Sequence, residues 1–312
     1  MRTAVIGTID GDGLVVADVL DDGALAVTRA LPEVREPSFL HLAGGTLYAV
    51  NELPEGTVTA LDPTDLTVRR TRPTLGAQPT HLTTHAGHLV VAHYLDGTVG
   101  AHPLAADGTP GESSTRLRHD GAEPHAHQVL PDPSGRWLIS VDLGSDAVHT
   151  HRIVDGALTA HARLDLPPGL GPRHLAFHGD RAHILGELRP ELVAADWDAA
   201  TGTFTPAWAL PLPAGNQPAE IVLSPDGRFA YATLRGDNTV AVVDLEHREV
   251  VQAVPVGGDW PRHCALDGTH LYVANQRSHS VTRLPWDPAT GLLSEPVGET
   301  RVRGASVVAF LG

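Results

Sequence analysis

The sequence predicts an all-β fold made of about seven small antiparallel sheets arranged as a closed ring, and three observations support this prediction. A proline followed by a short strand, a turn and a second strand recurs every 42 to 48 residues. Glycine and proline are abundant, at 32 and 25 of 312 residues, which indicates many turns. The apolar runs are short and rich in β-branched and aromatic residues, as in strands. A repeat of this length is typical of a β-propeller blade.

Six copies of the repeat follow one another along the chain. They begin at Pro37, Pro79, Pro124, Pro172, Pro218 and Pro261. Their second strands include LYAV, WLISV, FAYAT and LYVAN, and a third strand follows in each copy, as TVTAL, TVGAH, AVHTH, ELVAA, TVAVV and SVTRL. We therefore expect three or four antiparallel strands in each unit. A linear β-solenoid is the alternative, but its repeats are usually shorter.

The residues outside these copies supply a seventh unit. AVIGTI, LVVADV and ALAVTRA near the start can pair with SVVAFL near the end. A blade shared by both ends of the chain would leave no free sheet edge. The sequence therefore predicts a seven-bladed β-propeller with four-stranded antiparallel blades, whose ring is closed by the N- and C-terminal strands in one blade. It is expected to be a single domain over residues 1–312.

The composition argues against several classes of protein. There are 37 acidic and 22 basic residues, a net charge of −15, and every basic residue is arginine. This balance argues against a nucleic-acid or anionic-membrane partner. The one cysteine, Cys264, excludes an internal disulfide and a four-cysteine zinc site. No apolar run approaches the roughly 18 residues of a membrane span, and no signal-peptide pattern opens the chain, so a cytoplasmic location is expected.

Polar residues gather at one end of the predicted hairpins. In an antiparallel hairpin the start of the first strand lies beside the end of the second, so we expect side chains from both places on one face, where a propeller channel can hold a small ligand. These residues are Asn51, Glu52, His81, His93, His125, His127, Asp142, Arg173, His174, Glu187, Glu220, Arg235, Arg262, His263, Asn275 and Gln276.

Structural roles are the alternative for several of these residues. A histidine recurs two residues after the proline at His81, His174 and His263, as expected of a repeat-wide device that bonds the backbone of the next blade. His127 aligns with a leucine of other copies when counted from its proline, and with His174 when counted from its turn. Structural ion pairs are conceivable between Arg173 and Glu187 and between Arg235 and Glu220.

The 19 histidines form no recognisable metal motif. HExxH and zinc-finger spacings do not occur, and His149 and His151 end a third strand, where we expect them on an outer part of the blade. GxSxG, P-loop and GxGxxG motifs are also missing from the sequence, which excludes the usual seryl-hydrolase and nucleotide sites. We therefore expect neither a metal nor a cofactor.

With these residues identified, the chain resembles the seven-bladed propeller lactonase family, which includes propeller-type 6-phosphogluconolactonases and fungal carboxymuconate cycloisomerases. The matching stretches are PSFLHLAGGTLYAVNE, PHAHQVLPDPSGRWLISVDLGSDAV, GPRHLAFHGDRAHILGEL and PRHCALDGTHLYVANQRSHSV. The resemblance implies a metal-independent site with the family's histidine at His127, its arginines at Arg173 and Arg235, and its glutamate at Glu187. The chain departs from the family at Gly186, where members often have Asn, and at Leu234, where they often have Asn as well.

Together these features predict hydrolysis of an anionic sugar lactone similar to 6-phosphogluconolactone. Ester cleavage requires a base for water, a donor for the oxyanion and groups that hold the substrate. The expected base is His127 or Glu187, and Arg173 is expected to stabilise the oxyanion. The expected substrate-binding residues are His125, Asp142, His174, Arg235 and Gln276, with Arg235 holding a phosphate or carboxylate.

Two other functions fit the same residues. Cycloisomerisation of an unsaturated diacid needs similar groups, because it closes the kind of ring that a lactonase opens. A non-catalytic propeller that binds a metabolite or a protein is the other alternative, since fold does not decide function. The expected partner is a small anionic lactone or sugar acid, and the sequence indicates neither the substrate itself nor the oligomeric state.

Overall fold

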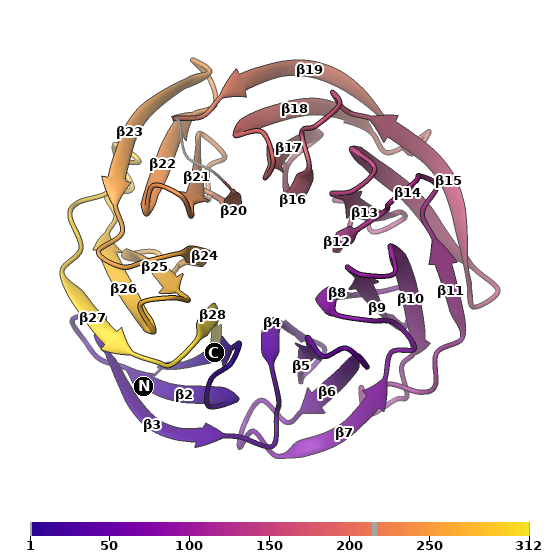
Figure 1. Ribbon diagram of the computed structural model, residues 1–312, viewed down its shortest axis with the longest axis horizontal. Helices are drawn as coiled ribbons and strands as arrows, with labels where there is room; N and C mark the ends of the chain where they lie inside the picture. Colours follow the sequence, from indigo (N-terminus) through magenta and orange to yellow (C-terminus); the bar gives the residue numbers. More distant parts are fainter. Residues whose placement is uncertain (1, 214–216, 312) are drawn as a thin grey trace. The chain divides into compact units, whose positions relative to one another are not determined.

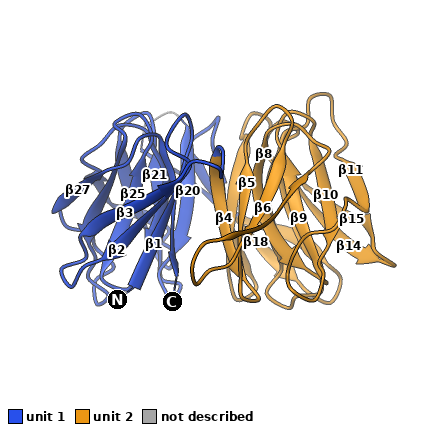
Figure 2. Ribbon diagram, turned by 90° about the horizontal axis from the view of Figure 1, so that it is seen from below, with its two compact units in different colours: residues 1–36, 185–193, 208–312 blue, residues 37–184, 194–207 orange. Residues whose placement is uncertain are grey.

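The computed structural model describes residues 2–213 and 217–311. Within these ranges the chain forms strands and turns, and it contains no helix, so none is long and apolar enough to cross a membrane. The chain divides into two compact units, shown in blue and orange in Figure 2. Unit 1 comprises residues 1–36, 185–193 and 208–312, and unit 2 comprises residues 37–184 and 194–207. The predicted single domain stays a prediction.

Unit 1 contains three complete four-stranded sheets. The first consists, in spatial order, of β28 (Ala305–Leu311), β1 (Arg2–Thr8), β2 (Leu14–Val19) and β3 (Leu25–Leu31). The second consists of β20 (Pro218–Leu223), β21 (Phe229–Leu234), β22 (Thr239–Asp244) and β23 (Glu249–Pro255). The third consists of β24 (Pro261–Leu266), β25 (His270–Asn275), β26 (Ser280–Pro285) and β27 (Gly298–Arg301).

Unit 2 also contains three complete sheets. They are β4 (Pro37–Ala43), β5 (Thr46–Asn51), β6 (Thr57–Leu61) and β7 (Val68–Pro73); β8 (Pro79–His85), β9 (His88–His93), β10 (Thr98–Pro103) and β11 (Thr115–Arg118); and β12 (Ala126–Pro131), β13 (Leu138–Asp142), β14 (Ala147–Val154) and β15 (Ala157–Asp165). The seventh sheet draws residues from both units: β16 (Pro172–His178), β17 (Arg181–Gly186), β18 (Glu191–Asp198) and β19 (Thr203–Pro211).

These seven four-stranded antiparallel sheets confirm the predicted fold class. Each of the six repeat copies supplies one sheet, and the seventh is shared by both ends of the chain, as predicted (Figure 1). Strand β28 pairs with β1, with Val5 opposite Ala309, and Ser306 Oγ donates a hydrogen bond to the Gly7 carbonyl at 3.0 Å. The Arg2 guanidinium lies 4.4 Å from the Phe310 ring centroid. Backbone pairing and side-chain contacts therefore both join the two ends of the chain.

Neighbouring sheets pack through their buried first, second and third strands. Tyr48, Tyr231 and Tyr272 are buried in the second strands of three blades, and each phenol donates to a glycine carbonyl, at Gly108, Gly291 and Gly23 respectively, over 2.7 to 2.8 Å. A buried tyrosine needs such an acceptor for its hydroxyl group. The fourth strands, such as β7 and β11, are polar and largely exposed, so no apolar run marked them in the sequence.

The first strands of several sheets begin with a β-bulge, which adds one residue that has no partner on the second strand. In β8, Pro79 pairs with His93 and His81 with Ala92, so one extra residue lies between the two pairs. The extra residues identified in this way are Ser38, Thr80, His127 and Arg262. Bulges redirect side chains and often adjoin functional sites. In β12 Ala126 takes the place of the proline, so the predicted alignment of His127 with the leucines is wrong by two residues and the one with His174 is wrong by one.

Candidate active site

The first cluster of predicted site residues lies in unit 2, around His127. This histidine is 5% exposed, and its backbone carbonyl accepts a hydrogen bond of 2.9 Å from Thr80 Oγ1, the bulged residue of β8. Its ring meets the rings of His174 and Tyr94 edge to face, with centroids 5.2 and 6.0 Å apart. The bulge and these aromatic contacts hold the imidazole of His127 in place.

Arg173 and His174 adjoin this ring at the start of β16. Arg173 is 3% exposed, and its Nη1 lies 3.4 Å from His174 Nε2. The His174 ring also meets His81 edge to face at 5.5 Å, and Phe39 stacks on His81 at 3.8 Å. Unit 2 therefore brings His174 together with His127 and Arg173, two of the three predicted catalytic residues. The guanidinium of Arg173 is buried beside imidazole rings.

His125 is attached to the same cluster through Tyr94. The two rings stack with centroids 4.4 Å apart, and His125 Nδ1 lies 2.8 Å from the Tyr94 carbonyl oxygen. A carbonyl only accepts, so Nδ1 carries the proton, and in the neutral ring Nε2 is an acceptor. These contacts fix the orientation of the His125 ring, and they do not test its predicted contact with the substrate.

The structure gives Asp142 a different position from the one expected of a substrate-binding group. Its carboxylate is completely buried and accepts hydrogen bonds from the amides of His125 and Gly144, at 2.7 and 3.0 Å, and from His119 Nδ1 at 2.9 Å. Burial raises the pKa of Asp142, but the bonds from His119, Ser145 and the His125 amide outweigh it and lower the pKa to about 2. Asp142 is therefore an anion that organises the interior of its blade.

A directional chain of hydrogen bonds extends inward from Asp142. His119 Nδ1 donates to the carboxylate, so its Nε2 accepts from Ser140 Oγ at 2.8 Å, and Ser140 Oγ accepts in turn from His151 Nε2 at 2.7 Å. His149 and His151 lie on the third strand of the blade, as predicted, but the strand continues past them to Val154 and both are buried. This network links the second strand, the third strand and the segment after β11.

The geometry of this network does not suit a metal ion. Ligand atoms of His119, Asp142 and His149 lie within 4.8 Å of one another. However, the two imidazole rings are stacked, with centroids 4.0 Å apart and planes 9° from parallel. A metal bound about 2.0 to 2.1 Å from nitrogen must lie near the plane of each ring, and two stacked rings share no such point. The cluster fits a hydrogen-bonded network of stacked imidazoles instead.

Buried histidines should make the folded chain sensitive to acid. Burial lowers the pKa of His93 to about 4 and that of His149 to about 3. Free imidazoles titrate near 6.5, so below this pH the unfolded chain binds more protons than the folded chain. Above pH 6.5 we expect neither histidine to change the free energy of unfolding. As the pH falls from 6.5 to about 4, each is expected to lower that free energy by roughly 1 kcal/mol per pH unit.

Urea unfolding at about pH 7.5 and about pH 5 measures this loss. His93→Gln should reduce the difference between the two pH values, whereas the matched change His88→Gln, at the less buried start of the same strand, should not. An equal acid response in the wild type and in His93→Gln would contradict the prediction.

The second cluster lies in unit 1, where Glu187 and Arg235 form an ion pair. Arg235 Nη2 lies 2.8 Å from Glu187 Oε2, and both side chains are largely buried. Arg235 Nε also donates to the Gln217 carbonyl at 2.7 Å, and Nη2 lies 3.4 Å from the Pro218 carbonyl. Burial lowers the pKa of Arg235; Glu187 raises it again, and the nearby Arg262 and Arg277 lower it further.

An aromatic ring lies beside this ion pair. The Arg277 Cζ is 3.3 Å from the Trp260 ring centroid, and the Arg235 Cζ is 5.2 Å from the same ring. Gln276, a predicted substrate-binding residue, donates its backbone amide to the Trp260 carbonyl at 3.0 Å. Neither Trp260 nor Arg277 was a sequence candidate. The one available signal was their position, since Trp260 precedes the repeat proline and Arg277 follows Gln276.

His263 has the repeat-wide role that the sequence left open. Its Nδ1 accepts the Val308 amide at 3.4 Å, so it bonds a strand of the next sheet, while its Nε2 lies 3.5 Å from Glu220. Gln128 takes the equivalent register in β12 and accepts the Leu175 amide at 2.7 Å. This position joins neighbouring blades in both units.

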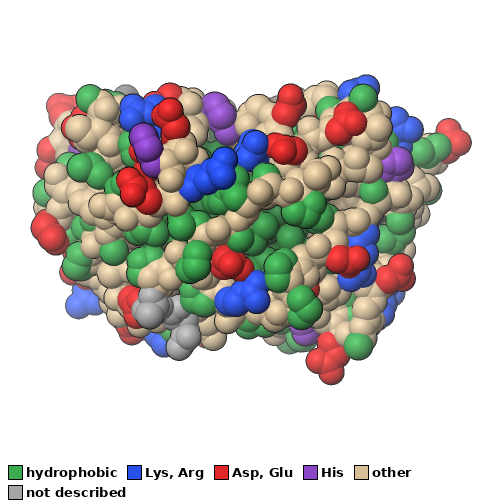
Figure 3. Space-filling model, turned by 90° about the horizontal axis from the view of Figure 1, so that it is seen from above, with side chains coloured by type: hydrophobic (Ala, Val, Ile, Leu, Met, Phe, Trp, Pro, Cys, Tyr) green, Lys and Arg blue, Asp and Glu red, His purple; other side chains and the backbone are tan. Residues whose placement is uncertain are grey.

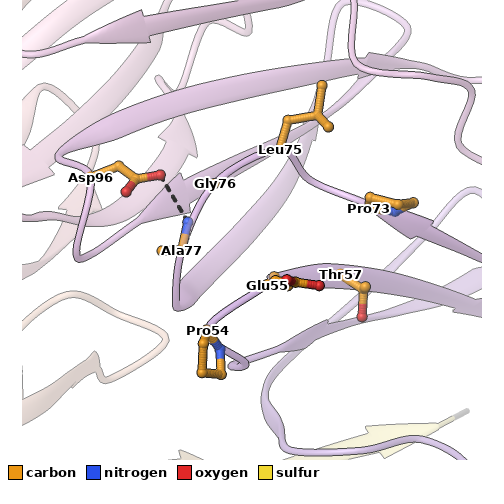
Figure 4. Close-up of a pocket in the computed structure, with 9 residues that line it drawn as sticks. Pro54, Glu55, Thr57, Pro73, Leu75, Gly76, Ala77 and Asp96 are labelled. Atoms are coloured by element: carbon orange, nitrogen blue, oxygen red, sulfur yellow. Dashed lines mark hydrogen bonds between the residues drawn. The ribbon is translucent and has the colours of Figure 1, made fainter.

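A pocket of about 450 Å³ lies elsewhere in unit 2, between the ends of β6 and β7 and the segment after β9 (Figure 4). It is lined by Pro54, Glu55, Gly56, Thr57, Pro73, Leu75, Gly76, Ala77 and Asp96. Asp96 accepts the Ala77 amide at 2.8 Å and lies 3.8 Å from Arg116. None of the predicted site residues lines this pocket, so it is separate from both clusters.

Comparisons with known proteins agree with this architecture. The family described as "Lactonase, 7-bladed beta-propeller" matches residues 3–310. Proteins named 6-phosphogluconolactonase from Bacillus subtilis and Pectobacterium carotovorum are 29% and 30% identical over 241 and 236 residues, which is 70% of this chain and 69% and 70% of theirs. The Pseudomonas aeruginosa periplasmic gluconolactonase is 27% identical with a TM-score of 0.89, covering 100% of this chain and 99% of that one. The chain therefore belongs to the seven-bladed β-propeller lactonase family.

Proposed function

We propose that this lactonase hydrolyses an anionic sugar lactone of the 6-phosphogluconolactone type, without a metal ion. The observation that carries the proposal is the buried group of His127, Arg173 and His174, in which the His174 ring contacts both the His127 ring and the Arg173 guanidinium. The names of the relatives and the anion-binding chemistry of the arginines support this substrate class.

In the proposed reaction His127 removes a proton from water as the water oxygen attacks the lactone carbonyl carbon. The carbonyl π electrons move to oxygen, and Arg173 stabilises the resulting oxyanion through N–H donors. When the oxyanion reforms the carbonyl, the ring C–O bond breaks. The imidazolium of His127 then returns its proton to the departing alkoxide, so that a hydroxy acid forms. Imidazole suits both transfers because it exchanges protons near neutral pH.

Glu187 has a supporting role in this proposal. Its carboxylate neutralises the buried Arg235, and an isolated buried guanidinium would be costly. Glu187→Gln is expected to lower kcat/KM about 10-fold, equivalent to about 1.4 kcal/mol, since a neutral amide keeps a hydrogen bond but loses the charge. Proton release after addition of fresh 6-phosphogluconolactone, with chelator present, measures the rate above spontaneous hydrolysis.

Glu191→Gln provides the matched control, because Glu191 forms an ion pair of 2.8 Å with the more exposed Arg189. It should leave the rate unchanged. If Glu187→Gln abolished turnover while His127 variants stayed active, Glu187 would be the base and the assignment to His127 would be wrong. Loss of wild-type activity in chelator would overturn the metal-independent mechanism.

A further inference from the structure

Trp260 in unit 1 contacts two guanidinium groups of very different exposure. Arg235 is 6% exposed, and its Nε and Nη2 are engaged by backbone carbonyls and by Glu187. Arg277 is exposed to solvent, and its guanidinium lies over the Trp260 ring at 3.3 Å. Stacking on an aromatic face fixes the plane of a guanidinium while its N–H donors stay available.

Several arginines of this chain are paired with carboxylates, whereas within the part of the chain that the structure describes Arg277 is not, nor is Arg152, whose Cζ lies 4.3 Å from the Trp137 ring centroid. Arg163, Arg181 and Arg189 lie 2.6 to 2.8 Å from carboxylates, and Figure 3 shows acidic and basic side chains close together on one face. Among the described residues no carboxylate lies within ion-pair distance of Arg277. In a chain with 37 acidic and 22 basic residues, an unpaired arginine held on a tryptophan indicates a site for an external anion.

The charges around Arg235 also favour an anion. Burial lowers the pKa of Arg235, and beyond the attraction of Glu187 it is repelled by both Arg262 and Arg277. Arg235, which already pairs with Glu187, thus lies near two further guanidinium groups. A phosphate or carboxylate near Arg277 would relieve this repulsion.

The backbone holds Trp260 firmly beside these arginines. Its φ is 66°, a conformation that bulky residues rarely adopt. Its amide donates to Asn238 Oδ1 at 2.8 Å, and its carbonyl accepts from the Gln276 amide. The residue before the repeat proline has a positive φ in four other copies as well, at Glu36, Gln78, Gly171 and Gln217. The conformation therefore recurs in five copies, and of these five residues only Trp260 carries an aromatic ring.

We propose that Arg277, stacked on Trp260, is an anion subsite that selects lactones carrying a phosphate or carboxylate over neutral ones. This inference rests on the proposed lactonase function and deepens it. It also replaces the predicted role of Arg235, which becomes the buried support of the subsite. Arg277 is a specificity-determining residue in this account and takes no part in breaking the ester bond.

Ligand binding to the chain of residues 1–312 tests this proposal directly. We expect the wild type to bind 6-phosphogluconate at least about 10-fold more tightly than gluconate in calorimetric titrations, a difference of about 1.4 kcal/mol. Arg277→Ala should remove most of that preference, and Arg277→Lys should restore only part of it, because an ammonium group neither stacks as well nor forms a planar fork. In turnover, Arg277→Ala should raise KM for 6-phosphogluconolactone more than it lowers kcat.

Arg248→Ala is the matched control, since Arg248 is also exposed and its Cζ lies 5.7 Å from the Trp208 ring in the same unit. It should leave binding and turnover unchanged. An undiminished preference in Arg277→Ala would overturn the subsite while leaving lactonase activity standing. Binding of 6-phosphogluconate that depends on Arg277, without hydrolysis of any lactone by the wild type, would support the subsite and refute the proposed function.

Discussion

His127→Ala is expected to lower the kcat of lactone hydrolysis by about 10² to 10⁴-fold, the usual contribution of a positioned general base. The imidazole is buried, its backbone is held by Thr80, and its ring contacts His174 and Tyr94, so no neighbouring group can move into its place without rearrangement. KM should change much less, because the proposed proton transfer occurs after binding. Initial rates of proton release over a range of lactone concentrations separate kcat from KM.

Two controls make this test decisive. His88→Ala removes a histidine from the start of β9 in the same unit, where Nδ1 bonds the Ala86 carbonyl, and it should retain full activity. Near-ultraviolet circular dichroism establishes that His127→Ala is folded. Wild-type kcat in the folded His127→Ala variant would refute the assigned base.

A similar loss in Arg173→Ala is expected because the oxyanion would lose its donor, at a cost of about 10² to 10³ in kcat.

Asp142→Ala is expected to destabilise the fold by about 3 to 5 kcal/mol, the usual effect of removing one partner of a buried charged network. The carboxylate has no exposure and accepts from His119 and from three backbone amides. Without it, His119 Nδ1 and these amides would be buried without an acceptor, and the order of protons through Ser140 and His151 would be lost. Thermal unfolding should show a decrease in Tm of roughly 10 °C.

Asp244→Ala provides a comparison within the same kind of turn. Asp244 follows the same pattern at the end of β22, accepting the amides of Glu246 and His247, but its histidine partner His247 is exposed. It should cost only about 1 kcal/mol. If Asp142→Ala kept wild-type stability and raised KM for the lactone, Asp142 would be the substrate-binding residue predicted from the sequence.

Much of the fold could be predicted because its signals are local and repeated. Each copy carries a proline, a turn and two apolar strands at nearly constant spacing, and the terminal strands are apolar enough to be recognised. The fourth strands were harder to locate, since β7 and β11 are held mainly by backbone pairing and expose polar side chains. Their sequences contain no alternation that distinguishes them from loops.

The candidate site could be predicted in part, because the sequence gives the position of a residue along its strand but not the direction of its side chain. His127, Arg173, His174, Glu187 and Arg235 lie at strand ends, and the hairpin rule identifies such positions without coordinates. Asp142 satisfies the same rule, yet its carboxylate turns toward backbone amides and His119. Position along a strand does not determine which way a side chain turns when backbone donors compete for it.

By itself the sequence determined the repeat, the seven blades, the pairing of the two ends and the family, because these follow from the order of apolar and turn residues. Only the tertiary structure decided that Arg235 pairs with Glu187, that His119 joins Asp142, and that Arg277 lies on Trp260. The partners in these contacts come from different strands or loops, from 17 to 48 residues apart. Such contacts depend on bulges, positive-φ turns and blade packing, whose angles are set by the folded backbone.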